Sequence, residues 1–252
     1  MKKYFLLIAI AFFTVNSKAQ TLNDLLNTAD KLLNGGGKKG NNNNNPLFGN
    51  SLSNTQIVSG LKEALKIGSQ NASQRLSLPN GFLGNQLIKI LLPPEVQKVE
   101  NTLRQFGFGN QCDKLILSLN RAAEDAAGKA VPIFVNAIAN MSINDGLSIL
   151  RGGNNAATEF LKRTTTGALT QAFRPVIQNS LGKVDATKYW DQVFTIYNTL
   201  PISKTKVNTD LAGYVTEKAL HGLFLNIAQE ENNIRTNPTA RVNDILRKVF
   251  GS

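Results

Sequence analysis

Along most of the chain, apolar residues recur every three or four positions, which is the spacing of one face of an α-helix. In the first such stretch Ile57, Leu61 and Leu65 fall on one side, and the run SNTQ at residues 53–56 has the pattern of a capping box. The same spacing predicts further helices at residues 94–106, 110–127, 132–138, 142–151, 156–181, 188–198, 209–235 and 238–250. We therefore expect a single all-α, multi-helix domain over residues 47–252.

Helix-breaking residues mark several of the predicted ends. Gly107 and Gly152 are placed to end helices, and Asn110 can cap the helix that follows the first of them. Pro175 lies inside the long pattern at residues 156–181 and predicts a kink or a split there.

One stretch departs from the helical pattern. Residues 87–92 are a strand candidate, and residues 76–78 are the segment with which they would pair. The fold prediction therefore includes one small β-hairpin as an option within the helical domain.

The N-terminus has the features of a secretory signal peptide over residues 1–19. Two lysines precede an apolar run at residues 4–15, and small residues at Ser17 and Ala19 predict cleavage before Gln20. An uncleaved membrane anchor is the alternative, but these twelve apolar residues are fewer than the roughly 20 that a spanning helix needs. We expect an exported protein, located in the periplasm or outside the cell, with no transmembrane segment after cleavage.

Two segments separate the signal peptide from the helical domain. Residues 20–34 predict a short amphipathic helix, and residues 35–46, GGGKKGNNNNNP, predict a flexible linker because they contain no apolar residue to bury. The reach of such a linker is about 20 Å. The short helix would dock on a membrane surface, in a groove of a protein partner, or back onto its own domain.

Net charge limits the kinds of partner that are expected, and the cysteine count limits disulfide formation. Without Lys2, Lys3 and Lys18 the chain keeps 25 of its 28 basic residues against 17 acidic ones, a net charge of +8. That charge favours an anionic envelope surface, and we do not expect nucleic acid as the partner. The single cysteine, Cys112, has no partner for an internal disulfide, and its apolar neighbours predict that it is buried.

The sequence lacks the residues that several kinds of catalytic or metal site require. One histidine and one cysteine do not make a zinc site, and a catalytic triad would have to use His221. His221 shares its side of the predicted helix with Glu217, Lys218 and Phe224, a half-buried boundary that favours packing over catalysis. Two carboxylates in a cleft would allow hydrolysis, but the adjacent acids at residues 230–231 point apart and resemble a solvated helix end. We predict no catalytic residue, metal ligand or cofactor.

Two polar groups are candidate sites. Asn120, Arg121 and Glu124 follow a strongly apolar run, where they would lock helices together or line a pocket. The run RGGNNAAT at residues 151–158 allows an anion site at a helix start, with Arg163 and Arg174 downstream, although a helix stop followed by a helix start is the simpler explanation.

Five runs of the sequence are distinctive: SLNRAAEDAAGKAVPIFVNAI, ILRGGNNAATEFLKRTT, FRPVIQNSLGKV, YVTEKALHGLFLNIAQEENNIRTNPTA and ILRKVFG. In these runs, and over residues 57–251 as a whole, the chain resembles the bacterial family called domain of unknown function 4197. The resemblance implies a helical, exported protein of Gram-negative bacteria and no known activity. In that family an acid is usual where His221 stands, and acids are common at the positions of Asn154 and Asn155. Both departures weaken a catalytic or metal-binding role for these residues.

The sequence favours a non-enzymatic binding or interaction protein. The first alternative is a carrier of a lipid or another apolar ligand, in a cavity lined by Phe160, Phe173, Tyr214 and Phe224 with a polar mouth near Arg121 or Arg163. The second is a carboxylate-dependent hydrolase of envelope material, through Glu124 or Glu230. The candidate ligand-binding residues are Asn120, Arg121, Glu124, Arg163, Arg174, Tyr214 and Lys218.

Overall fold

A computed structural model describes a large part of the predicted helical domain. The described residues are 53–184, 186, 190, 195, 198, 210–237 and 247. They all belong to the second of two units, Met1–Asn43 and Asn44–Ser252. The predicted signal peptide, short helix and linker lie outside the described residues, as do most of the predicted helices at 188–198 and 238–250.

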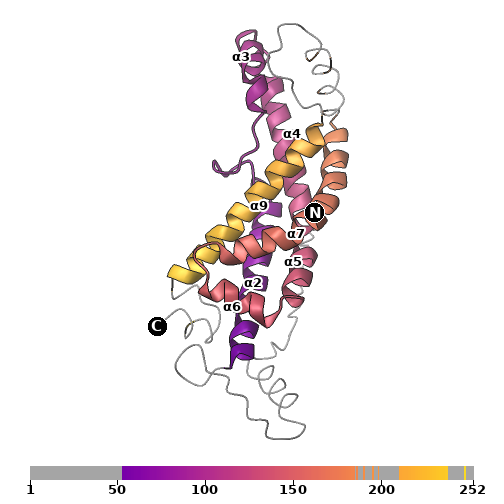
Figure 1. The fold of residues 1–252 in the computed structure, drawn as a ribbon. Helices are drawn as coiled ribbons and strands as arrows, with labels where there is room; N and C mark the ends of the chain where they lie inside the picture. The colour runs from indigo at the N-terminus through magenta and orange to yellow at the C-terminus, as the bar shows by residue number, and fades with distance from the viewer. Residues whose placement is uncertain are drawn as a thin grey trace, which may run out of the picture. The chain divides into compact units, whose positions relative to one another are not determined.

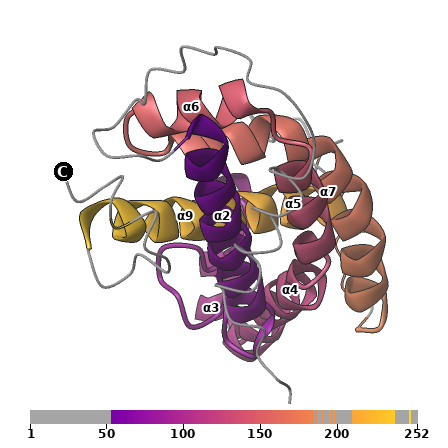
Figure 2. The ribbon, with the colours of Figure 1, turned by 90° about the horizontal axis from the view of Figure 1, so that it is seen from below.

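The described part of the chain is all-α, as predicted, and contains no β-strand. Its elements are α2 (Asn54–Ser77), the 3₁₀ turn η1 (Pro94–Val96), α3 (Gln97–Gln105), α4 (Gly109–Ala127), α5 (Ala130–Ala139), α6 (Ile143–Arg151), α7 (Ala156–Gly182) and α9 (Leu211–Thr236). Figures 1 and 2 show how these helices cross one another.

Local sequence signals account for several helix boundaries. The capping boxes at Ser53 and Ser142 are both present, each with a side-chain hydroxyl that accepts a backbone N–H three residues on. Gly107 follows α3 with a φ of 89°, a left-handed conformation that glycine adopts without strain. The predicted cap at Asn110 is wrong, because α4 already begins at Gly109 and its N-cap residue contributes no side-chain bond.

α7 continues through Pro175, so the predicted split at that residue does not occur. In Figures 1 and 2 the ribbon of α7 bends along its length instead. Because the exposed proline removes only one backbone donor, the remaining hydrogen bonds and the buried side chains of Phe173 and Ile177 keep the helix in one piece.

The core forms where α7 crosses α4 and α9, and where α2 packs against α5 and α9. Its largest fully buried side chains include Phe82, Phe134 and Phe173. The rings of Phe134 and Phe224 meet edge to face, with centroids 6.2 Å apart and an angle of 74° between the ring planes. This geometry is favourable for aromatic pairs and links α5 to α9.

The predicted hairpin is wrong. Leu76 lies in α2, and residues 78–93 connect α2 to η1 through turns and an irregular segment. The strand-like pattern does appear in the burial, because Ile88 and Ile90 are buried while Leu87 and Leu91 are exposed. The segment therefore packs one side against the core without a partner strand.

Asn120 of α4 takes the place of that partner. Its Oδ1 accepts a hydrogen bond from the N–H of Ile90 at 2.9 Å, and its Nδ2 donates to the carbonyl oxygen of Ile90 at 2.8 Å. The same Nδ2 also donates to the carbonyl oxygen of Ile116 at 2.7 Å. The fully buried amide thus pairs backbone groups that would otherwise be buried and unsatisfied.

Replacing Asn120 by leucine should destabilise the protein strongly. The substitution Asn120→Leu keeps the approximate volume but leaves the N–H and carbonyl of Ile90 without partners, so the free energy of unfolding should fall by about 3 kcal/mol. Urea denaturation followed by circular dichroism measures this change. The control Asn179→Leu, on the exposed side of α7, should change it by less than about 0.5 kcal/mol. Equal effects of the two substitutions would contradict the role given to Asn120.

Candidate functional site

Glu124 lies one turn beyond Asn120 and holds the start of the same connecting segment. Its Oε1 accepts the N–H groups of Phe82 and Leu83 at 3.1 and 3.2 Å. Its Oε2 accepts a hydrogen bond from Arg121, whose other terminal nitrogen donates to Asn80 at 2.9 Å. Glu124 is only 3% exposed, so this carboxylate is committed to backbone and guanidinium partners.

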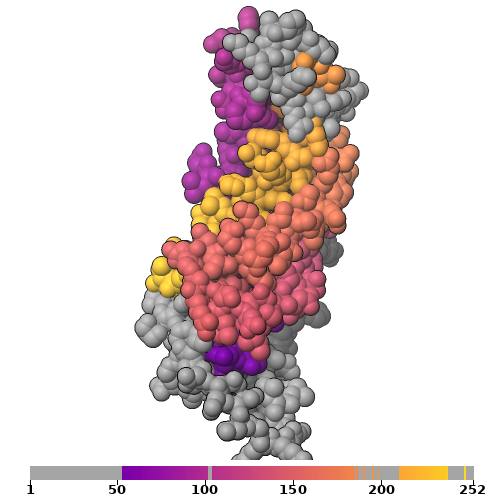
Figure 3. All heavy atoms as spheres, in the orientation of Figure 1, coloured from indigo at the N-terminus to yellow at the C-terminus, as the bar shows by residue number. Residues whose placement is uncertain are grey.

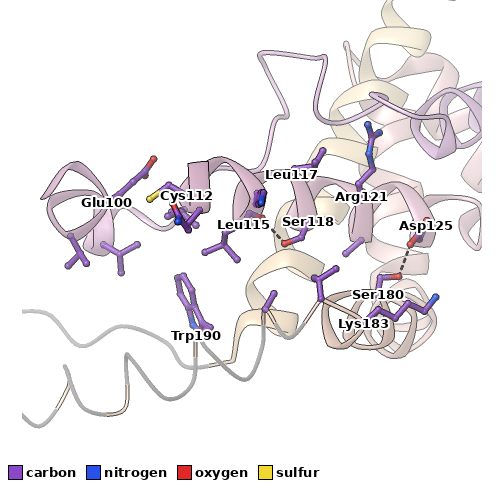
Figure 4. A pocket seen from close by; sticks show the side chains of 18 residues that line it. Glu100, Cys112, Leu115, Leu117, Ser118, Arg121, Asp125, Ser180, Lys183 and Trp190 are labelled. Carbon is purple, nitrogen blue, oxygen red and sulfur yellow. Dashed lines mark hydrogen bonds between the residues drawn. The ribbon is translucent and has the colours of Figure 1, made fainter. Parts of the chain in front are cut away.

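A groove of about 820 Å³ lies beside α4. Figure 4 shows it between α4 and α3 on one side and the end of α7 with Trp190 on the other. Its lining residues are Leu92, Val96, Val99, Glu100, Gln111, Cys112, Lys114, Leu115, Leu117, Ser118, Arg121, Ala122, Asp125, Ser180, Lys183, Val184, Ala186 and Trp190.

The groove is apolar along its length and polar towards its ends. Leu115 and Ser118 lie along its middle on the side of α4 towards Trp190, and Leu117 points from the opposite side of α4 (Figure 4). Glu100 and Cys112 lie towards one end, and Arg121, Asp125, Ser180 and Lys183 lie towards the other (Figure 4). An apolar channel with polar groups at its ends matches a ligand that has both an apolar and a polar part.

The acids of the groove are engaged by neighbouring groups. Glu100 accepts a hydrogen bond from Arg104 at 2.9 Å, and Arg104 also donates to Asp113 at 2.8 Å. The hydrogen bonds that Arg104 donates to Asp113 and Glu100 raise the pKa of Arg104 above its usual value. Asp125 accepts a hydrogen bond from the hydroxyl of Ser180 at 2.6 Å.

The two lysines that line the groove differ from its acids in their bonding. Lys114 and Lys183 are exposed, and the described residues provide no hydrogen bond or ion pair to either ammonium group. Among the described charged side chains of the lining, these two ammonium groups are therefore the ones that can take a bond from a ligand without giving up a partner. An anionic group is the complement of such a site.

Cys112 is buried, as predicted, and its side chain forms part of the groove wall. Burial raises the pKa of its thiol, an effect that Arg104 opposes and nearby acids reinforce. The sulfur therefore stays protonated at neutral pH and contributes an apolar surface in place of a nucleophile.

The helix start at residues 156–158 already holds an anion, which belongs to the protein itself. Glu231 of α9 accepts the N–H of Ala157 at 3.0 Å, and the N–H and hydroxyl of Thr158 at 2.8 Å each. Arg235 donates to the same carboxylate at 2.9 Å and to the carbonyl oxygen of Ile149 at 3.0 Å. The predicted anion site is thus filled from within, and α6, α7 and α9 are joined at this point.

The prediction of a solvated helix end at residues 230–231 is wrong for Glu231, which is only 6% exposed. The two acids do point apart as expected. Glu230 forms an ion pair with Arg75 of α2 at 2.9 Å, on the more accessible side of α9. Neighbouring carboxylates therefore have different environments, one inside and one near the surface.

The remaining candidate residues are spread over α7 and α9. Arg163 lies 5.7 Å from the ring centre of Phe160, and Arg174 forms an ion pair with Asp210 at 2.7 Å. Lys218 lies 5.6 Å from the ring centre of Tyr214. Of the seven predicted binding residues, Arg121 is the one that belongs to the described lining of the groove.

The aromatic lining predicted for a carrier cavity is not the lining of this groove. Phe160, Phe173 and Phe224 are buried in the hydrophobic core. Tyr214 is half-buried, and its hydroxyl donates to the carbonyl oxygen of Leu91 at 2.9 Å. The aromatic side chain that does face the groove is Trp190, which was not predicted from the sequence to line a cavity.

His221 lies on the exposed side of α9, so the prediction of a half-buried packing position is wrong. It is not among the described residues that line the groove. Nor do the described residues contain a cluster of three or more histidine, cysteine or acidic side chains able to hold a metal ion. Among the same residues no single helix meets the length and hydropathy of a membrane span, whereas α5 and α6 meet them only jointly, bent by 104°.

One signal in the sequence could have indicated the groove. The run LILSL at residues 115–119 is apolar around most of a helical turn, which is more than one packing face requires. Ile116 and Leu119 enter the core, and Leu115 and Leu117 are left for the groove. No comparable local signal identifies Glu231, because its partners lie more than 70 residues away in the chain.

Comparison with protein families gives one match. Residues 51–251 match the family described as "Protein of unknown function (DUF4197)". No curated protein and no solved structure matches the chain.

The two adjacent acids of α9 should differ sharply in their contribution to stability. Glu231→Gln removes the carboxylate that pairs two backbone N–H groups and Arg235, so the free energy of unfolding should fall by about 3 kcal/mol. Glu230→Gln breaks a partly exposed ion pair and should cost less than about 1 kcal/mol. Thermal and urea denaturation of both variants test this. A loss in Glu230→Gln as large as that in Glu231→Gln would contradict the assignment.

Tyr214 should produce a specific loss of stability at high pH. Burial, with smaller effects of Glu95 and Glu217, raises the pKa of Tyr214 to about 12. Below about pH 10 the phenol is protonated in both states, whereas between about 10 and 12 the unfolded chain releases a proton that the folded protein retains. Stability should therefore fall as the pH rises through this window. The fall should be smaller in Tyr214→Phe, and the tyrosinate absorbance of the wild type should show one late-titrating group.

Proposed function

We propose, for this member of the DUF4197 family, that the groove binds one amphipathic molecule, with an apolar chain along α4 and an anionic head group at a lysine. The description of the family states no activity, so the proposal is drawn from the groove. The observation that carries this proposal is the apolar groove of about 820 Å³ itself. Its volume lies within the roughly 300–1,000 Å³ that is typical of small-molecule sites.

Burial of an apolar chain would supply the binding free energy. Each methylene group transferred from water contributes about 0.8 kcal/mol, so about ten of them contribute about 8 kcal/mol before ordering costs are subtracted. The middle of the groove, with Leu115 and Trp190, offers the apolar surface for this transfer. A single long chain suits the groove better than a compact polar metabolite does.

The head group would be anionic because the two lysines that line the groove have no bonded partner among the described residues. Glu100 and Asp125 are bonded to Arg104 and Ser180, whereas Lys114 and Lys183 are exposed at the groove. An ammonium group pairs with a carboxylate or a phosphate through strong, charge-assisted hydrogen bonds. A fatty acid or a lipid with one accessible chain has this combination of parts.

The chemistry of the groove favours binding over turnover. Ser118 donates to the carbonyl oxygen of Leu115 and Ser180 to the carboxylate of Asp125, and the single histidine of the chain, His221, is not among the described residues of the lining, so neither hydroxyl has an imidazole base beside it there. The thiol of Cys112 is held protonated by burial. We propose that this binding takes place after export, the location that the N-terminal sequence predicts.

A direct test uses the only tryptophan of the chain, Trp190, which faces the groove. Titration with oleate should change the emission of Trp190 in a saturable way, with one molecule bound per chain. Native mass spectrometry of the purified protein should show the same stoichiometry. The absence of any saturable change in emission would overturn the proposed function.

A groove variant makes the test specific. Leu117 is 39% exposed and lines the groove, so Leu117→Asp should leave the fold intact while placing a charge beside the apolar chain. Affinity for oleate should fall at least about tenfold. The matched control is Ile143→Asp in α6, because Ile143 is 45% exposed and lies outside the groove. Unchanged affinity in Leu117→Asp would place the ligand elsewhere.

A further inference from the structure

The turn between α3 and α4 carries two exposed aromatic side chains. Phe106 is 75% exposed and Phe108 is 49% exposed, and Gly107 lies between them with its φ of 89°. Phe106 is the most exposed large apolar residue of the described chain. Burying such a side chain elsewhere would be favourable by about 2 kcal/mol, so an aromatic pair on an ordered turn indicates a contact surface.

The turn is held in place at its base. Arg104 of α3 is bonded to Glu100 of α3 and to Asp113 of α4, which ties the two helices together. The N–H of Gly107 donates to the carbonyl oxygen of Arg104 at 3.1 Å, and the carbonyl oxygen of Phe108 accepts from the first turn of α4. The exposure of the two rings is therefore imposed by the structure around them.

The charge around the turn suits a lipid surface. Residues 105–112, QFGFGNQC, contain no ionisable side chain apart from the protonated Cys112. At the base of the turn Arg104 pairs with both Glu100 and Asp113, so each of these charged groups has a bonded partner and the cluster keeps a net charge of −1. The turn can therefore enter the head-group region of a bilayer without removing an unpaired charge from water. Without the predicted signal peptide the chain carries a net charge of +8, which attracts it to anionic lipids.

The turn also leads directly into the groove. Phe108 precedes Cys112 by four residues and Leu115 by seven, so all three fall on the same side of α4. Cys112 and Leu115 belong to the groove wall. An apolar path thus runs from the exposed rings to the proposed ligand site.

We propose that Phe106 and Phe108 insert into the surface of an anionic phospholipid bilayer, and that the ligand passes between bilayer and groove along this side of α4. The transfer step rests on the proposed function of the groove. The bilayer contact does not, because it depends only on the turn and on charge.

The bilayer contact is tested with unliganded protein and vesicles containing anionic phospholipid. Phe106→Ser and Phe108→Ser should each weaken co-flotation about tenfold, since each removes one inserted ring. Ile143→Ser is the control, because α6 lies at the other end of the described helices from α3 in Figures 1 and 2. Wild-type flotation of the double variant would overturn the contact. Equally strong binding to zwitterionic vesicles would overturn the choice of an anionic surface.

The transfer step is tested by mixing protein with vesicles that carry a dansyl-labelled fatty acid, with energy transfer from Trp190 as the signal. The double phenylalanine variant should load at least about tenfold more slowly than wild type, while its affinity for oleate in vesicle-free buffer stays unchanged. Leu117→Asp should show the opposite result, with normal flotation and weak oleate binding. Equal loading rates in wild type and the double variant would overturn transfer through the turn. If flotation depends on Phe106 and Phe108 but the wild type does not bind oleate, the proposed function of the groove is overturned and the bilayer contact is not.

Discussion

In the described part of the chain, Asn120, Glu124 and Glu231 pair buried backbone groups that no helix satisfies, and the rest of the structure depends on that pairing. Asn120 and Glu124 bind the segment between α2 and η1, and Glu231 binds the start of α7. Leaving a buried N–H unpaired costs as much folding free energy as several favourable contacts contribute. Such segments therefore pack only where a hydrogen-bond partner is supplied. With Ile90 and Phe82 fixed on α4, the chain enters η1 and α3 at one defined place, and α3 becomes a wall of the groove.

α4 is the element on which both the core and the groove are built. Ile116 and Leu119 enter the core, while Leu115 and Leu117 line the groove and Asn120 holds the connecting segment. A helix with apolar residues around most of its circumference needs more than one apolar neighbour. Here one of those neighbours is the core, and the other side of the helix lines the apolar groove.

Local features of the fold could be predicted from the sequence, and long-range polar pairs could not. The capping box at Ser53 and the burial of Cys112 follow from neighbouring residues, which is why those predictions are confirmed. The hairpin prediction recognised the alternating burial of residues 87–92 but could not see that an amide 30 residues away would replace the second strand. Glu231 was misjudged for the same reason, since its burial depends on the start of α7.

The wall that α3 forms differs physically from the other wall of the groove. α4 and α7 cross within the hydrophobic core, whereas α3 packs mainly against α4 and the preceding turn. Much of what joins α3 to α4 is the ion pairing of Arg104, with Glu100 on one helix and Asp113 on the other. Partly exposed ion pairs are weaker than core packing and respond to nearby charge. If the proposed bilayer contact forms, the negatively charged lipid surface competes for Arg104 at the point where α3 meets α4, and the wall that borders the exposed phenylalanines is then the wall that yields most easily.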